Sequence, residues 1–102
     1  VHEAIDIGGS AGSAIYASDD GVVVYAGWND WGYGYTAVLD HGNGWQTLYA
    51  HNGQINVGCG QSVSQGSVIA AMGCTGNCTG THVHFEMRSD SFGRVNPLLF
   101  LP

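Results

Sequence analysis

The sequence predicts an all-β protein, in which mostly antiparallel strands form one compact domain with almost no helix. Polar and Gly-containing breaks recur about every 8–12 residues, the spacing typical of all-β domains. The segments between these breaks are rich in Val, Ile, Tyr and Trp, which favour strands. No window of about 11 residues or more carries apolar side chains at the period of a helix.

Seven segments are expected to be strands, because each is short, rich in these residue types and lies between the polar or Gly-containing breaks. In chain order they are Ala4–Ile7, Ala14–Ala17, Val22–Ala26, Tyr35–Asp40, Trp45–His51, Val68–Met72 and His82–Arg88. Turns are expected at residues 19–21, 41–44 and 52–53, where Asp, Asn and Gly gather. The fourth and fifth segments flank the turn at 41–44, so they are expected to pair as a hairpin.

Residues 57–68 contain two short units with similar spacing. Val57 is followed by Gly60, and Val63 is followed by Gly66, so each unit is typical of a brief strand and a turn. Because two such units are too short to build a solenoid, the pattern indicates a local pseudo-repeat within one domain.

The length and charge of the chain exclude several classes of protein. For 102 residues we expect one domain, residues 1–102, and the lack of an initiator Met suggests that it is cut from a longer chain. A hydrophobic content of 44% allows a real core. Only two side chains are cationic and the formal net charge is −6, so there is no basic surface for nucleic acid. No apolar run approaches the ~20 residues of a membrane span, so no membrane insertion is expected.

The strongest chemical pattern is His82-Val83-His84-Phe85-Glu86. Side chains of a strand alternate between its two faces. His82, His84 and Glu86 would therefore share one face, while the two apolar residues anchor the other face in the core. Two imidazoles on one face favour a metal-binding or catalytic role over a buried, hydrogen-bonded pair.

Two further patterns could join this strand. His2 and Asp6 supply an imidazole and a carboxylate near the start of the chain, and His51 leaves an aromatic-rich strand. Taken singly, an N-terminal His and an Asp are more often solvated surface residues. Together, His2, Asp6 and His84 form a His₂Asp set, and catalytic zinc sites commonly use three protein ligands and leave the fourth position for water. His51 and His82 would remain for proton transfer and for stabilising an oxyanion.

The three Cys residues leave more than one interpretation open. Cys74 and Cys78 could form a disulfide, which would indicate an oxidising compartment, or they could be reduced and inert. They could also bind a structural zinc ion with His82 and His84, although two His residues separated by one position are unlike the spacing of zinc fingers. Cys59 would be left over if the other two were paired.

Several motifs together resemble a known family. Those with functional side chains are His2-x-x-x-Asp6, Tyr49-Ala50-His51 and Gly73-x-Thr75-Gly76-x-x-Thr79-Gly80-x-His82-x-His84-Phe85-Glu86. Between and after them lie Ala17-x-x-Asp20-Gly21-x-Val23, Val57-x-x-Gly60-Gln61-x-Val63-x-x-Gly66 and Val95-Asn96-Pro97-Leu98. In order and spacing these motifs resemble the lysostaphin/LytM-type zinc endopeptidases of bacterial cell walls. The resemblance covers essentially the whole chain.

The resemblance implies an all-β fold of the duplicated hybrid motif type, with a narrow groove between loops. It implies one Zn2+ ion held by His2, Asp6 and His84, with His51 and His82 as the non-ligand catalytic residues. Such enzymes hydrolyse peptide bonds in peptidoglycan stem peptides or cross-bridges, through attack of a zinc-activated water on the scissile carbonyl. We therefore expect a monomer that acts outside the bacterial cytoplasm, in the cell wall or periplasm.

Aromatic residues cluster around Gly32 and Gly34, at Trp28, Trp31, Tyr33 and Tyr35. Some could pack in the core. A loop this rich in aromatic residues could also form one wall of the groove and stack on a peptide or glycan, with Trp31 and Tyr33 as the candidates for substrate binding. His41, the fifth histidine, lies in an expected hairpin turn and is interpreted as structural.

Two other functions fit parts of the pattern. A domain of the same fold could bind the wall or activate another hydrolase without cleaving, although all five expected site positions are filled. A phosphocarrier could pass a phosphoryl group between His51 and His82, but His2 and Asp6 would then have no role.

Overall fold

The computed structural model describes residues 4–42, 44–76, 78–89 and 93–95, and within them the chain forms nine strands and no helix. The strands are β1 (Ala4–Gly8), β2 (Ala14–Tyr16), β3 (Gly21–Asn29), β4 (Gly34–Asp40), β5 (Trp45–Ile55), β6 (Ser62–Val63), β7 (Val68–Met72), β8 (His82–Ser89) and β9 (Gly93–Val95). Their pairings are antiparallel. The all-β prediction is therefore confirmed. Over these same ranges, no helix is long and apolar enough to span a membrane.

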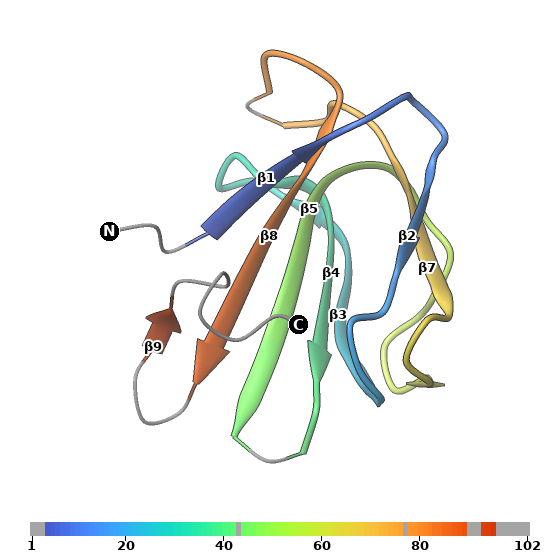
Figure 1. Ribbon diagram of the computed structural model, residues 1–102, viewed down its shortest axis with the longest axis vertical. Coiled ribbons are helices and arrows are strands. Elements are labelled where there is room, and N and C mark those ends of the chain that lie inside the picture. Colours follow the sequence, from blue (N-terminus) through green and yellow to red (C-terminus); the bar gives the residue numbers. More distant parts are fainter. Residues whose placement is uncertain (1–3, 43, 77, 90–92, 96–102) are drawn as a thin grey trace.

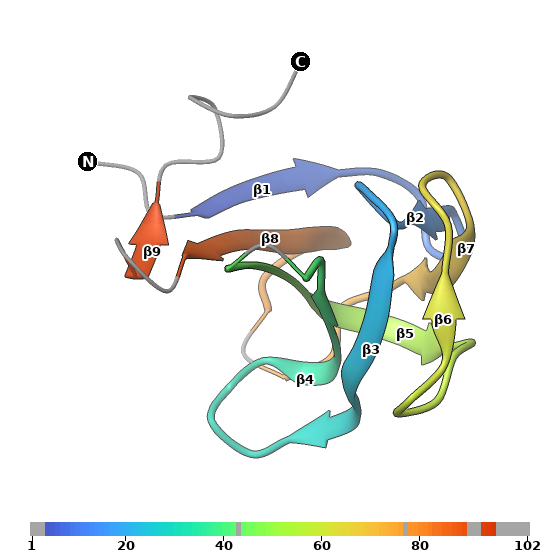
Figure 2. The same cartoon turned by 90° about the horizontal axis from the view of Figure 1, so that it is seen from below.

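β8 lies between β1 and β5, and this arrangement positions the candidate site (Figure 1). The strand order is β1-β8-β5-β4-β3-β6, with β7 paired to β5 and β2, and β9 paired to β8. In Figure 2, β1 and β8 run nearly at right angles to β3 and β6, which shows how strongly the sheet twists. The first and last parts of the described chain therefore lie side by side.

β5 is the strand that differs most from expectation. The expected hairpin of β4 and β5 is confirmed. The turn expected at residues 52–53 is wrong, because β5 continues through it to Ile55. Up to Ala50 the strand pairs with β8, and from Asn52 it pairs with β7, with a register irregularity between Asn52 and Gln54. The Asn-Gly pair thus marks a change of partner within one strand and not a chain reversal.

Two short strands are not among the expected segments. The pseudo-repeat at residues 57–68 contributes only β6, which pairs with the start of β3. β9 pairs with the end of β8. In these two segments, of two and three residues, the side chains are too few to show an alternating pattern, and neither has the Ala-Ile-Tyr run that marks the equally short β2.

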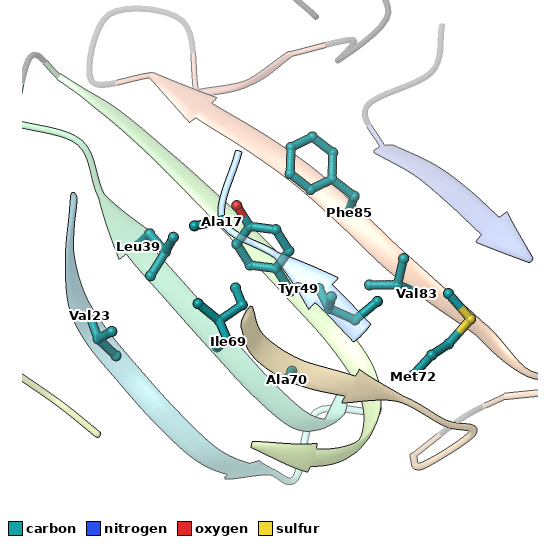
Figure 3. Packing of buried hydrophobic residues seen from close by; sticks show 11 residues of the cluster. Ala17, Val23, Leu39, Tyr49, Ile69, Ala70, Met72, Val83 and Phe85 are labelled. Carbon is teal, nitrogen blue, oxygen red and sulfur yellow. The ribbon is translucent and has the colours of Figure 1, made fainter. Parts of the chain in front are cut away.

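Buried apolar side chains from several strands form one core (Figure 3). The cluster consists of Ile15, Ala17, Val23, Ala37, Leu39, Tyr49, Ile69, Ala70, Met72, Val83 and Phe85. Val83 and Phe85 are buried as the alternation predicts. A one-residue slip of β8 would take both out of the core, at a cost of up to roughly 1.5–3 kcal/mol each. The core therefore fixes which face of β8 carries the histidines.

Candidate functional site

The pairing of β1 with β8 brings Asp6 against the two histidines of β8. Asp6 lies opposite His84 in the antiparallel register. Its Oδ1 is 2.9 Å from Nδ1 of His84 and 3.7 Å from Nε2 of His82. Three residues singled out in the sequence therefore meet, although 78 positions separate Asp6 from His84.

A buried carboxylate holds His84 from the other side. Oε2 of Glu86 accepts hydrogen bonds from Nε2 of His84 at 2.8 Å and from the Tyr33 hydroxyl at 2.6 Å. Its Oε1 accepts hydrogen bonds from Nε and Nη2 of Arg88 at 3.0 and 2.7 Å. Because the Glu86 side chain has no exposed surface, these charge-assisted bonds replace the water that a carboxylate otherwise needs. Glu86 therefore orients the His84 ring, with Nδ1 toward Asp6.

These contacts shift the pKa values of both partners. Burial alone would raise the pKa of Glu86, but hydrogen bonds from His84, Tyr33 and Arg88 outweigh it and lower the pKa to about 2. The hydrogen bond to Glu86 is the largest effect on His84 and raises the pKa of that ring above 6.5. Burial opposes this rise, and the hydrogen bond to Asp6 adds to it. In the metal-free chain, the two carboxylates thus stabilise the protonated form of His84.

His51 occupies a strained backbone position where β5 changes partner. Its φ is 62°, the only positive φ of a non-glycine residue in the part of the chain that the structure describes. That conformation is costly for a residue with a side chain, and such strain clusters at functional sites. The backbone N–H of His51 donates to O of Tyr33 at 2.7 Å, and its O accepts from N of Thr75 at 3.4 Å. The buried ring lies with its centroid 5.0 Å from that of His82 and 5.8 Å from that of His84.

Both His51 and His82 use Nδ1 in a hydrogen bond to a backbone carbonyl. Nδ1 of His51 donates to O of Thr75, and Nδ1 of His82 donates to O of Gly80, each at 2.6 Å. Because a carbonyl can only accept, each ring carries a proton on Nδ1. In the neutral ring, Nε2 is then the basic nitrogen, which is the state that a general base requires.

The two aromatic residues considered for substrate binding lie in different surroundings. The ring of Tyr33 stacks on that of His84, with 5.6 Å between centroids, and its hydroxyl reaches Glu86. Trp31 is 90% exposed in the turn between β3 and β4, and its backbone N–H donates to Oδ1 of Asn29. Tyr33 is therefore part of the histidine cluster, whereas the Trp31 side chain faces solvent.

Cys74 and Cys78 form a disulfide beside His82, and Cys59 is free and exposed. A disulfide sulfur is not a thiolate ligand. The alternative of a zinc site built from these two Cys residues with His82 and His84 is therefore contradicted, as is the alternative of two reduced thiols.

His41 makes contacts of a structural kind, away from the cluster. Its Nδ1 donates to O of Asp20 at 2.6 Å, and its Nε2 accepts from the Thr47 hydroxyl at 2.8 Å. The ring thus joins the turn before β3 to the β4–β5 hairpin.

The described residues supply part of a zinc site. Oδ1 of Asp6 and Nδ1 of His84 are donor types that zinc accepts, and zinc bonds of about 2.0–2.2 Å place two tetrahedral ligand atoms roughly 3.3–3.6 Å apart. A slight opening of the 2.9 Å contact between them would admit the ion. A carboxylate on the second nitrogen of a zinc-binding His, as Glu86 provides, is also typical of such sites.

A complete ligand set does not lie within the described part of the chain. In residues 4–42, 44–76, 78–89 and 93–95, no group of three or more His, Cys, Asp or Glu side chains is arranged to hold a metal. His2, the third ligand expected from the sequence, lies outside the described residues. The described residues therefore supply two of the three expected zinc ligands, Asp6 and His84, and the carboxylate of Glu86 that orients His84.

Three contributors to this cluster carry little or no functional signal in the sequence. Strand alternation places Glu86 on the face of the two histidines, but the hydrogen bond from His84 to Glu86 cannot be seen in the sequence. The carbonyl groups of Thr75 and Gly80 carry no sequence signature, because every residue has one.

Comparison with known proteins gives one family and a consistent set of neighbours. The sequence profile of Peptidase family M23 matches residues 1–97. The chain is 45% identical over 101 residues to "Murein hydrolase activator NlpD" of Escherichia coli (strain K12), covering 99% of this chain and 26% of that protein. It thus spans about a quarter of that relative's length.

Two solved structures are similar over nearly the whole chain. The catalytic domain of the antimicrobial peptidase lysostaphin from Staphylococcus simulans superposes with a TM-score of 0.91 at 31% identity, covering 97% of this chain and 77% of that one. A zinc containing peptidase from Vibrio cholerae gives a TM-score of 0.89 at 32% identity, covering 99% of this chain and 31% of that one.

Proposed function

Because this chain belongs to peptidase family M23, we propose that it is a zinc-dependent endopeptidase that hydrolyses peptide bonds in stem peptides or cross-bridges of bacterial peptidoglycan. The observation that carries the proposal is the meeting of Asp6, His51, His82 and His84, which come from β1, β5 and β8. Two of these side chains are candidate metal ligands. The other two are rings whose Nδ1 is engaged by a backbone carbonyl.

One Zn2+ ion would be held by Asp6 and His84, with His2 as the third ligand. When bound, zinc supplies a Lewis acid that polarises a peptide carbonyl and lowers the pKa of water toward neutrality. Glu86 keeps the proton of His84 on Nε2 and thereby leaves Nδ1 for the metal. The stacked Tyr33 ring holds the His84 plane in place.

His51 and His82 would carry the proton transfers. Nε2 of either ring can take a proton from the attacking water. The protonated ring can then donate a hydrogen bond to the developing oxyanion or pass the proton to the leaving amine. Nε2 of His82 lies 3.7 Å from Oδ1 of Asp6, so its basic nitrogen is beside the candidate metal-binding carboxylate.

Trp31 and Tyr33 would contact the substrate. The exposed indole of Trp31 offers a face for stacking on a peptide or a glycan, and Tyr33 lies directly against the histidine cluster. We expect the domain to act as a monomer in the cell wall or periplasm. The Cys74–Cys78 disulfide supports an oxidising compartment of this kind.

A second candidate function is the activation of another murein hydrolase. The observation that favours it is the 45% identity to a protein named as such an activator. In this role the chain would bind the wall or the hydrolase, and the histidine cluster would not cut peptide bonds.

Metal analysis combined with digestion of purified peptidoglycan separates the two functions. The endopeptidase should hold one zinc ion per chain and release new peptide ends, and chelation or His82→Ala should abolish the release. Peptidoglycans with glycine-rich and with direct cross-links should both be offered. A zinc-loaded chain that cuts neither but accelerates an added murein hydrolase would establish the activator role instead.

A further inference from the structure

The loop between β7 and β8, residues 73–81, supplies the hydrogen-bond acceptors of both His51 and His82. O of Thr75 accepts from His51, and O of Gly80 accepts from His82, each at 2.6 Å. The orientation of both rings therefore depends on one loop.

The first half of this loop is anchored to β4 and β5. The hydroxyl of Thr75 donates to O of Asn52 at 2.5 Å and accepts from N of Tyr35 at 3.0 Å. Gly76, with φ of 74°, is packed so closely that a Cβ there would lie 2.5 Å from O of Gly32. These contacts fix the acceptor of the first ring without help from the rest of the loop.

The second half of the loop is more open. Residues in both halves are exposed, but a Cβ at Gly80 would meet nothing within 4 Å, whereas one at Gly76 would clash. The restraints on this half include a long hydrogen bond of 3.4 Å from N of Gly9 to O of Thr81. They also include the disulfide at Cys78, whose Sγ lies 3.5 Å from Nδ1 of the His82 ring.

We propose that the Cys74–Cys78 disulfide is a positioning element for His82. The covalent bond ties the open half of the loop to the anchored half and restricts the conformations of the short segment between them. The carbonyl of Gly80 is thereby kept within hydrogen-bond distance of Nδ1 of His82, so that Nε2 of this ring stays directed toward Asp6. The inference rests on the proposed function only for the catalytic role of His82.

The test compares the double variant Cys74→Ser/Cys78→Ser with a Cys59→Ser control, which removes only the free, exposed thiol. Nitrogen NMR of the neutral imidazoles reports which ring nitrogen carries the proton. In the double variant, His82 should change from the Nδ1–H form to a mixture with the Nε2–H form. His51 should keep its Nδ1–H form, because its acceptor is anchored by β4 and β5.

Zinc content should be unchanged in the double variant. Its kcat on peptidoglycan should fall by roughly tenfold or more, toward the ~10²-fold that a misplacement of about 1 Å can cost. The Cys59→Ser control should match the unsubstituted chain in all three measurements.

The inference is overturned if His82 keeps the Nδ1–H form in the double variant, or if both rings change equally, which would indicate general loosening. If the double variant does not fold, dithiothreitol can reduce the folded Cys59→Ser chain instead. The disulfide then gains two electrons and two protons to become two thiols, and the reductant becomes a cyclic disulfide. A chain that binds zinc but cleaves nothing would defeat the proposed function, while the proton positions would still decide this inference.

Discussion

Nε2 of His84 donates a 2.8 Å hydrogen bond to Glu86, a carboxylate with no exposed surface. The bond determines that the other ring nitrogen, Nδ1, faces Asp6. Tyr33 and Arg88 satisfy the remaining capacity of the carboxylate. A fully buried charge therefore sets the geometry of a candidate metal ligand.

Replacing Glu86 with Gln should weaken zinc binding by roughly 10–100-fold, the loss typical when the partner of a metal-binding His is changed. Gln can still accept from His84, but it removes the negative charge that favours the Nε2–H form and that pairs with Arg88. Competition with a chromophoric chelator measures the affinity. Tyr33→Phe is the matched control, because it removes one hydrogen bond to Glu86 and keeps the stacked ring, so its loss should be smaller. Unchanged affinity in Glu86→Gln would show that the pair does not support the metal.

His84→Ala and His82→Ala should separate metal binding from chemistry. His84→Ala should abolish zinc binding, because it removes a ligand. His82→Ala should keep zinc and lose cleavage, because the Nδ1 of that ring is engaged by Gly80 and its Nε2 is left for proton transfer. Elemental analysis and peptidoglycan digestion give the two readouts. Near-normal cleavage by His82→Ala would refute the assigned role.

His51→Ala should be less stable than His51→Gly by about 1 kcal/mol, because φ of 62° is unfavourable for any residue with a Cβ. Both variants lack the imidazole, so both should be inactive and their difference isolates the backbone. Denaturant unfolding measures the two free energies. Equal stability, or a more stable Ala variant, would mean that this backbone position is not strained.

Zinc affinity should rise with pH through the neutral range. Because Glu86 raises the pKa of His84, a proton must be displaced from that ring before metal can bind at lower pH. For this one proton, affinity should fall by up to about tenfold for each pH unit below the raised pKa. Zinc titrations across pH measure the effect, and Glu86→Gln should move the dependence to lower pH. An identical profile in that variant would argue against Glu86 as the cause.

The metal-free chain should lose stability as pH rises through the pKa of His84. A pKa raised on folding contributes stability that is fully present below 6.5 and disappears above the raised value. Glu86 acts in the opposite direction: its stabilisation is present above 4.5 and is lost as pH falls toward about 2. Protein kept metal-free with a chelator should therefore be most stable in mildly acidic solution. Urea unfolding of the chain and of His84→Ala across pH tests this. The variant should not show the loss of unfolding free energy at higher pH. If the two curves of unfolding free energy against pH were parallel, the assignment to His84 would be contradicted.

The histidine-bearing face of β8 was predictable from residues 82–86 alone. Alternating side chains form a local pattern, and Val83 and Phe85 are buried in the core as that pattern requires. That the chain does not turn at residues 52–53 was not predictable. Asn and Gly mark a reversal in most strands, and only the pairing of β5 first with β8 and then with β7 keeps the chain extended there.

The sequence by itself determined the all-β class, the family and the side chains available for metal binding and proton transfer, because residue type and short-range spacing encode these properties. The tertiary structure decided that Asp6 meets His84, that Glu86 orients that ring, and that Thr75 and Gly80 hold His51 and His82. Pairing between distant strands is set by the packing of the whole core. Hydrogen bonds to backbone carbonyls depend on where a loop lies. Neither the strand pairing nor these hydrogen bonds can therefore be predicted from short-range patterns in the sequence.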